Sequence, residues 1–117
     1  MAKYQPFKLR YQRQKERFFR LQKQVQKAID YLYQQGAEQV YIFGSFLKPE
    51  RFDEHSDIDL AVKGIDNLHT RLKIEARLMQ IFQDADFDLV WLDDETEIKP
   101  HVLRAIKKEG KLCLRIR

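Results

Sequence analysis

The stretch from Phe43 to Val62, FGSFLKPERFDEHSDIDLAV, decides how the rest of the sequence is interpreted. A Gly-Ser pair ends one apolar run, and the pair Asp57 and Asp59 opens another, with 11 residues between Ser45 and Asp57. Carboxylates this close to a buried strand are costly unless another group compensates their charge. The stretch therefore raises the question of which group does so.

The length and composition of the chain fit one domain. Its 117 residues, 44% of them hydrophobic, are enough to bury a core, and the 34% of charged residues favours a soluble protein. No apolar run approaches the ~18 residues that a membrane helix needs, and the N-terminus lacks the apolar segment of a secretory signal. The single cysteine, Cys113, excludes an internal disulfide and a cysteine-based zinc site. We therefore expect a cytoplasmic protein without membrane contact.

Positive charge is concentrated at the start of the chain. Residues 1–30 hold nine Lys and Arg against Glu16 and Asp30, whereas the remainder holds 13 basic and 16 acidic residues. Such a basic segment could face a nucleic acid or an acidic protein, or it could be an ordinary solvated helix face. The sequence leaves these alternatives open.

Apolar periodicity predicts the order α, β, β, α, β, α, β. The first helix, residues 11–35, has an apolar face with spacings of 3 and 4, made of Phe18, Leu21, Val25, Ala28 and Leu32. This spacing also occurs in coiled coils, but it lasts barely two heptads, so packing on a sheet is favoured. The later elements are strands over 39–43, 58–62 and 87–92, helices over 68–83 and 99–109, and an edge strand over 111–116. The middle helix is marked by Leu68, Leu72, Leu78, Ile81 and Phe82.

Strands that alternate with helices predict an α/β (α+β) fold with one mixed sheet of about four strands, covered by helices. The loop between the first two strands is too short for a regular crossover helix. We therefore expect these strands to be antiparallel neighbours or to have only a short helix between them. Within the single domain 1–117 we distinguish a basic N-terminal helix, 1–35, and a core, 36–117.

The candidate site begins with the two aspartates. Asp57 and Asp59 are two positions apart at a strand start, so both side chains point to the same side, ~6.5 Å apart along the chain. Magnesium is usually held by one or two carboxylates together with substrate phosphates, which would compensate their charge. A third carboxylate is expected on a neighbouring strand, and Asp88 in the run FDLVWL supplies one.

A second group of residues is suited to phosphate. Gly44 permits a tight turn and close backbone approach at the strand end, and a helical turn after it would offer free N–H groups beside the Ser45 hydroxyl. Ser56, next to Asp57, is either a further nucleotide contact or an ordinary turn residue. Taken singly, Gly-Ser pairs and Asp-x-Asp triplets are also common in turns without any function.

The combination of motifs resembles the signature of the DNA polymerase beta-like nucleotidyltransferase superfamily: Gly-Ser, a loop, Asp-x-Asp, and a third Asp on a later strand. The phrase SDIDLAVKG and the small size are similar to the minimal nucleotidyltransferases of the MntA type, antitoxins paired with HEPN-domain ribonuclease toxins. The resemblance covers residues 25–116. It implies that Gly44 and Ser45 contact the nucleotide phosphates and that Asp57, Asp59 and Asp88 are the catalytic and metal-binding residues.

The sequence departs from this family at two points. The loop between Ser45 and Asp57 is one residue longer than is usual there. Many members place an arginine directly after the Gly-Ser, whereas this chain has Phe46, with Lys48 and Arg51 as the nearest bases. All three carboxylates remain, which favours a chain that retains its activity.

The resemblance implies transfer of AMP from ATP to a hydroxyl, assisted by two Mg²⁺ ions. Asp57 and Asp59 would hold the metals, and Asp88 would share the acceptor-side metal and take the proton. Because the domain leaves no residues for an acceptor-binding domain, we expect a protein acceptor: a tyrosine of a HEPN toxin, in a hetero-oligomer. Two alternatives remain, namely an antitoxin that inhibits by binding alone, and a transferase that acts on nucleic acid through the basic helix.

Overall fold

The computed structural model describes the backbone of residues 6–115 and the side chains of residues 12–115. In chain order, its helices and strands are α1 (Pro6–Gln34), β1 (Gln39–Phe43), β2 (Ile58–Lys63), α2 (Leu68–Ile81), β3 (Phe87–Trp91), α3 (Pro100–Glu109) and β4 (Lys111–Cys113). Three short 3-10 helices complete the described chain: η1 (Gly44–Leu47), η2 (Pro49–Arg51) and η3 (Leu92–Glu97). No helix in this described part is both long and apolar enough to cross a membrane.

The four strands form one mixed sheet in the order β3-β2-β1-β4. β1 pairs antiparallel with β2 and with β4, whereas β2 and β3 are parallel neighbours joined through α2. The predicted α+β fold with a four-stranded mixed sheet is confirmed. Both expected features of the connection between β1 and β2 occur together, because the two strands are antiparallel and the loop between them contains η1 and η2.

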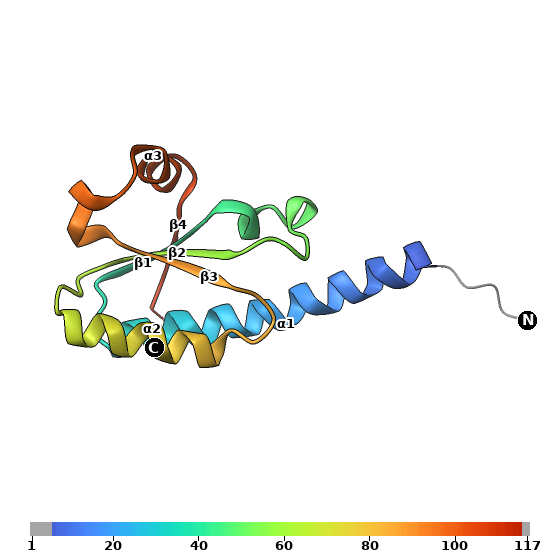
Figure 1. Ribbon diagram of the computed structural model, residues 1–117, viewed down its shortest axis with the longest axis horizontal. Coiled ribbons are helices and arrows are strands. Elements are labelled where there is room, and N and C mark those ends of the chain that lie inside the picture. The colour runs from blue at the N-terminus through green and yellow to red at the C-terminus, as the bar shows by residue number, and fades with distance from the viewer. Residues whose placement is uncertain (1–5, 116–117) are drawn as a thin grey trace, which may run out of the picture.

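Helices cover both faces of the sheet. Figure 1 shows α1 and α2 along one face and α3 on the other, with the N-terminal part of α1 extending past the sheet. The predicted apolar face of α1 is buried, since Leu21, Val25, Ala28 and Leu32 are each at most 4% exposed and belong to the main core. The periodicity of α1 therefore reflects packing on a sheet, and the coiled-coil alternative is not needed.

The helix α1 begins earlier than expected. The sequence predicted a start near Tyr11, whereas the helix already begins at Pro6. Proline is well tolerated in the first turn of a helix, because its missing N–H would have no partner there and its φ is already helical. Pro6 therefore marks the start of this helix.

The orientation of α2 differs from the prediction. Leu68 and Leu72 were expected on its buried face, but they are 70% and 57% exposed, while Ile74 and Leu78 are fully buried. The sheet-facing position one turn before Ile74 is taken by Arg71, whose guanidinium lies 4.9 Å from the Trp91 ring centroid. The two leucines fall on the other side of the helix because the sequence offers apolar residues on both faces.

The last strand is shorter than predicted. The alternation of Leu112, Leu114 and Ile116 in the tail KLCLRI predicted a strand over 111–116, whereas β4 spans only Lys111–Cys113. Its register pairs Val40 with Cys113, and Leu112 and Leu114 remain 40% and 76% exposed. Ile116 lies outside the described residues.

The two leucines of α2 give a direct test of its orientation. Leu78→Ala is expected to lower the free energy of unfolding by ~2–5 kcal/mol, because it leaves a cavity in a packed core. Leu72→Ala, the same change on the exposed face, should alter it by less than ~0.5 kcal/mol. Urea denaturation measures both values, and a large effect at Leu72 would contradict the orientation described above.

Candidate active site

Three aspartates meet at one end of the β2–β3 pair. Asp59 lies opposite Asp88 in the parallel register, and Asp57 directly precedes β2, two residues before Asp59. Paired residues on neighbouring strands present their side chains to the same face. Asp59 is half-buried, whereas Asp57 and Asp88 are exposed. The predicted third carboxylate on a neighbouring strand is thus present.

The carboxylates lie on the α3 side of the sheet. Along β2, Ile58 and Leu60 enter the main core under α1 and α2, while Ala61 belongs to a smaller cluster with Phe43 and Ile106 of α3. Because side chains alternate along a strand, Asp59 faces the same side as Ala61. A charged group in this half-buried position is retained against its desolvation cost, which indicates a role other than packing.

The environment of Asp59 opposes its ionisation. Burial, followed by the charges of Asp88 and then Asp57, raises the pKa of Asp59 from 3.8 to about 6. Burial and the neighbouring negative charges both disfavour the charged form of Asp59. A bound cation would compensate the negative charges. The site therefore has the electrostatics of a cation-binding position.

Gly44 fits closely against this carboxylate. It follows Phe43, the partner of Asp59 in the β1–β2 register, and has a φ of +79°. A Cβ atom on Gly44 would lie 2.2 Å from Asp59 Oδ2, so no side chain can be accommodated without movement. Ser45 follows in η1, where its carbonyl accepts a hydrogen bond from Lys48 N at 2.9 Å. The helical turn that the sequence predicted after Gly44 is present, directly beside Asp59.

Ser56 has a local partner. Its hydroxyl accepts from Asp53 N at 3.0 Å and donates to Asp53 Oδ1 at 3.2 Å, and His55 N donates to the same Asp53 oxygen at 2.8 Å. These bonds close a tight turn immediately before Asp57. The turn alternative considered for Ser56 describes its position in the structure, and a nucleotide contact by Ser56 stays a prediction.

The helix α1 anchors the segments that lead into the site. Arg17 Nε donates to Asp84 O at 2.9 Å and Arg17 Nη1 to Asp53 O at 3.1 Å. Gln24 Nε2 donates to Asp84 Oδ2 at 2.7 Å, and this bond, with the nearby Arg20, lowers the pKa of Asp84. The two carbonyls belong to the loops before β2 and β3. Sequence reasoning missed this role, because nothing local marks a contact across 67 positions.

Phe46, the residue directly after the Gly-Ser pair, packs against α1. Its ring centroid lies 4.8 Å from that of Phe18 and 5.5 Å from that of Phe52, and Phe18 and Phe52 are also 5.5 Å apart. The loop between β1 and β2 is thereby folded onto the helix. Of its two bases, Lys48 lies 3.7 Å from Glu109 Oε1, so it approaches α3.

The residues present fit a metal that arrives with its substrate. In the described part of the chain, no group of three His, Cys, Asp or Glu side chains is placed so that it could hold a metal ion. Magnesium, however, keeps several waters and is typically bound by one or two carboxylates plus substrate phosphates. Asp57 and Asp59, with Asp88 opposite, can supply such a partial set of ligands.

The raised pKa of Asp59 predicts a pH-dependent stability in metal-free buffer. The unfolded chain ionises this carboxyl near pH 3.8, whereas the native chain keeps its proton up to about pH 6. Between these values the native state binds more protons than the unfolded state, so its stability falls as the pH rises. Asp59→Asn cannot ionise and escapes this loss.

In thermal melts in EDTA, the stability of Asp59→Asn relative to the wild type should therefore increase from about pH 4 to about pH 6. Above that range the difference between the two proteins should stay constant. Asp66→Asn, which changes an exposed acid beyond the other end of β2, serves as the control. A stability difference between Asp59→Asn and the wild type that does not change with pH would contradict the raised pKa of Asp59.

Two glycines separate backbone strain from contact with the carboxylate. Gly44 and Gly36 have φ values of +79° and +107°, but a Cβ on Gly36 would meet nothing within 4 Å. Gly36→Ala should cost only the ~1–2 kcal/mol of left-handed strain. Gly44→Ala should lower the free energy of unfolding by more, because its Cβ would also meet the Asp59 carboxylate. Denaturant melts measure this loss, and calorimetry should show weaker binding of ATP with magnesium. Equal losses of stability and unchanged nucleotide binding would show that Gly44 serves the turn alone.

Comparison with known proteins agrees with this geometry. Residues 26–115 match the family model for polymerase beta nucleotidyltransferases. No curated protein sequence matches the chain. Among solved structures, a chain of a mutant MntA–HpeT toxin–antitoxin complex is 24% identical, with a TM-score of 0.57, over 79% of this chain and 73% of that one.

Two further structures are of the same kind. A toxin–antitoxin structure with AMP-PNP is 24% identical, with a TM-score of 0.56, over 78% of this chain and 73% of that one. A second MntA–HpeT mutant is 25% identical, with a TM-score of 0.54, over 79% and 73%. The family match spans the sheet, the Gly-Ser turn and all three aspartates. The chain therefore belongs to the polymerase beta nucleotidyltransferase family.

Proposed function

We propose that this chain is an antitoxin that transfers AMP from ATP to a tyrosine hydroxyl of a cognate HEPN-domain toxin and thereby neutralises it. The observation that carries the proposal is the register of Asp59 with Asp88, with Gly44 pressed against Asp59. This arrangement leaves room for a phosphate at the backbone of the turn, directly beside the carboxylates. The 25% identity to a chain of the MntA–HpeT toxin–antitoxin complex supports the choice of antitoxin.

Each residue of the site has a role in this proposal. Gly44 lets the turn approach the triphosphate, and the Ser45 hydroxyl and the backbone N–H groups of η1 donate to its oxygens. Asp57 and Asp59 would hold magnesium, with Asp88 as a further ligand on the acceptor side. Magnesium, when bound, would neutralise the phosphate charge and lower the pKa of the acceptor hydroxyl.

The transfer exchanges one bond to phosphorus for another. The acceptor oxygen attacks the α-phosphorus of ATP, the bond from that phosphorus to the bridging oxygen breaks, and pyrophosphate leaves. In this proposal Asp88, which is exposed and lies opposite Asp59, receives the proton of the acceptor hydroxyl. Holding the reactants in line and neutralising charge supply most of the rate in such transfers.

A protein acceptor suits the exposure of the site. Asp57 and Asp88 are both solvent-exposed, and only Asp59 is half-buried. A hydroxyl on the surface of a folded protein can therefore reach the carboxylates without entering a deep pocket. Addition of AMP would place negative charge and bulk on the toxin, which would oppose binding of RNA near the modified tyrosine.

The test needs a cognate HEPN-domain protein, which is to be sought in the open reading frames that flank this one. Mixed with ATP and magnesium, the wild type should raise the intact mass of that protein in steps of one AMP and lower its ribonuclease activity. The double variant Asp57→Asn, Asp59→Asn should lose the mass shift, and EDTA should abolish it for the wild type. The double variant Asp66→Asn, Glu75→Gln is the control, since it removes the same charge away from the site.

Two outcomes would replace the proposal. Equal inhibition of the ribonuclease by the wild type and by the Asp57, Asp59 double variant, with no change of mass, would indicate inhibition by binding alone. Incorporation of AMP into RNA in place of the protein would indicate a transferase that acts on nucleic acid.

A further inference from the structure

The strand β3 lies at an open edge of the sheet. The order β3-β2-β1-β4 gives it a neighbour on one side only. On that side, Ile58 N of β2 donates to Asp86 O, directly before β3, at 3.0 Å. Backbone groups alternate in direction along a strand, so the N–H and C=O groups of Asp88 and Val90 also point toward β2. The residues between them point the other way.

Phe87, Leu89 and Trp91 therefore turn their N–H groups outward, and the first two also turn out their carbonyls. None of the hydrogen bonds among the described residues reaches these outward groups. The side chains of the same three residues pack against the main core, which holds the row of backbone groups in place. A row of alternating donors and acceptors along a strand is complementary to an extended polypeptide, which adds a further strand to the sheet.

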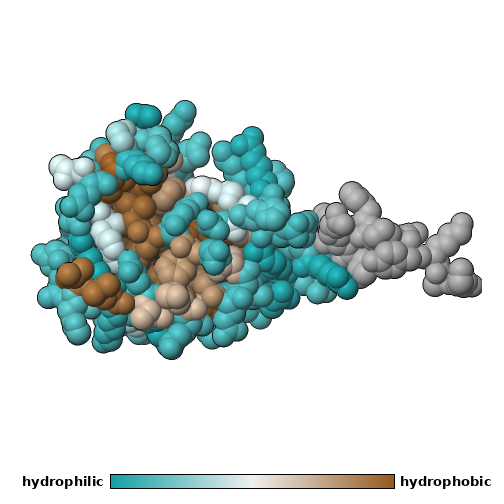
Figure 2. Space-filling model, viewed as in Figure 1, coloured by the Kyte–Doolittle hydropathy of each residue, from teal (hydrophilic) through white to brown (hydrophobic). Residues whose placement is uncertain are grey.

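A groove lies beside this edge, on the face of the sheet that carries the carboxylates. It has a volume of about 280 Å³, with β3 on one side and Ile98, Lys99 and Val102 on the other. Val90 and Val102 belong to the apolar cluster under α3, the side toward which Asp88 also points. Figure 2 shows apolar side chains gathered in the middle of the viewed face, where Figure 1 draws β3 and the segment that leads to α3. An added strand would thus find backbone partners on β3 and a place for an apolar side chain.

The spacing along β3 connects this groove to the chemistry. Val90 follows Asp88 by two residues, so their side chains lie on one face, ~6.5 Å apart along the strand. In an added strand, the residue beside Val90 would enter the groove, and the residue two positions from it would lie beside Asp88. Cross-strand neighbours have Cβ atoms ~5 Å apart, within reach of a side chain as long as tyrosine. A hydroxyl two positions from an apolar residue would thus be presented to the carboxylates.

Charge along the edge favours a basic polypeptide and opposes a nucleic acid. Residues 84–98 hold seven acids and no Lys or Arg. Three of these acids form ion pairs within the chain, whereas Asp86, Asp88 and Glu97 are exposed and have no cationic partner among the described residues. The phosphates of RNA would be repelled by these carboxylates, while Lys or Arg in an added strand would be attracted.

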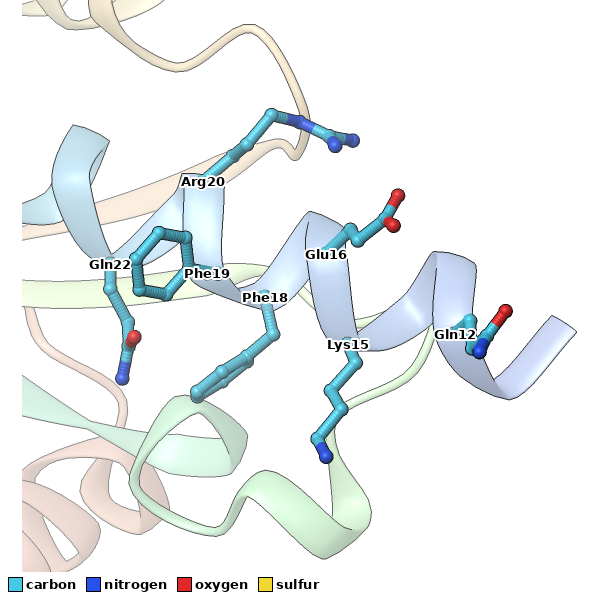
Figure 3. A pocket seen from close by; sticks show the side chains of 7 residues that line it. All are labelled: Gln12, Lys15, Glu16, Phe18, Phe19, Arg20 and Gln22. Carbon is cyan, nitrogen blue, oxygen red and sulfur yellow. The ribbon is translucent and has the colours of Figure 1, made fainter. Parts of the chain in front are cut away.

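The hollow on α1 lacks these features. It is larger, about 790 Å³, but Figure 3 shows that its side chains all come from one helix, with Lys15 and Phe18 pointing toward the loop after β1 and Glu16 and Arg20 to the opposite side. Backbone groups inside a helix bond to one another and offer no such row to a partner. The helix α1 also covers the face of the sheet opposite the carboxylates. The β3 edge is therefore the surface better placed for an acceptor.

We propose that an extended segment of the protein acceptor adds a strand to the free edge of β3 and so presents its hydroxyl beside Asp88. The segment carries an apolar residue two positions from the modified residue, and Lys or Arg nearby. This inference rests on the proposed function for the identity of the acceptor, whereas the way it docks follows from the edge, the groove and their register.

Hydrogen exchange followed by NMR tests the edge directly. The probe is the HEPN-domain protein of the transfer assay, added in EDTA and without nucleotide to the inactive double variant Asp57→Asn, Asp59→Asn. The three outward amides of β3 should exchange about tenfold more slowly in the complex, because each gains a hydrogen bond. The amides of Asp88 and Val90, which already bond to β2, should change little.

Matched prolines on the two edges of the sheet test the same point in the transfer assay. Leu89→Pro removes an outward N–H from β3, a change that an edge strand tolerates. It should raise the KM for the protein acceptor about tenfold, as expected for the loss of one hydrogen bond. Leu112→Pro is the control, because the pairing of β4 with β1 turns the Leu112 N–H away from the sheet at the other edge, and its KM should equal that of the wild type.

Circular dichroism melts establish that both proline variants are folded, and the exchange experiment decides the question where Leu89→Pro is not. Unchanged exchange of the three outward amides, or a wild-type KM for a folded Leu89→Pro, would exclude docking on β3 and would leave the proposed function intact where the mass shift persists. An equal rise of the KM for Leu112→Pro would attribute the effect to the sheet as a whole and overturn the inference.

Three further results bear on the occupant of the edge. A modified residue without an apolar residue two positions away would exclude the proposed register. Slow exchange of the outward amides in the protein alone, increasing with its concentration, would assign the edge to a second copy of this chain. A wild type that produces no mass shift would refute the proposed function, and the exchange experiment, which contains no nucleotide, is independent of that result.

Discussion

The half-buried carboxylate of Asp59 imposes the constraint on which the rest of the site depends. It is held between two other acids on one side and the backbone of Gly44 on the other, and its pKa is raised to about 6. Both the desolvation and the like charges oppose ionisation near neutral pH. A domain that keeps this arrangement gives up stability at the position, and such a cost is typical of functional sites. A cation with its phosphate ligands relieves the repulsion.

The geometry of this site is maintained from a distance by α1. Arg17 joins the loops that precede β2 and β3 by donating to the carbonyls of Asp53 and Asp84, while Phe18 packs on Phe46 and Phe52 of the loop after β1. Three segments that carry candidate site residues are thus fixed to one helix. The positive charge of α1 therefore has a structural component, which composition alone cannot distinguish from charge that faces a partner.

Local patterns were sufficient to predict most of the fold. Runs such as QVYIF and FDLVW are too short and too β-branched or aromatic for helices, and the antiparallel pairing of β1 with β2 follows from the length of the loop between them. The placement of Asp88 opposite Asp59 could be expected only because a third carboxylate had to lie on an adjacent strand. The family resemblance made that expectation specific.

The errors arose where one pattern permits two packings. The helix α2 has apolar residues on both faces, so periodicity could not show that Ile74 and Leu78 face the sheet and Leu72 faces solvent. The contacts of Arg17 depend on chain folding over long sequence separations, and no local rule predicts them. For the same reason, the sequence showed that Phe46 departs from the family pattern but could not predict its contact with Phe18.

The position of η1 connects the chemistry to the surface of the molecule. One end of this short helix, Gly44, is fixed by the close approach of Asp59, and Leu47 at its other end forms part of an apolar groove. The aromatic contacts of Phe46 with α1 hold the segment between these ends. An arginine at position 46 would be charged and could not join that aromatic cluster without desolvation, so Phe46 provides a fixed connection between the turn and the helix.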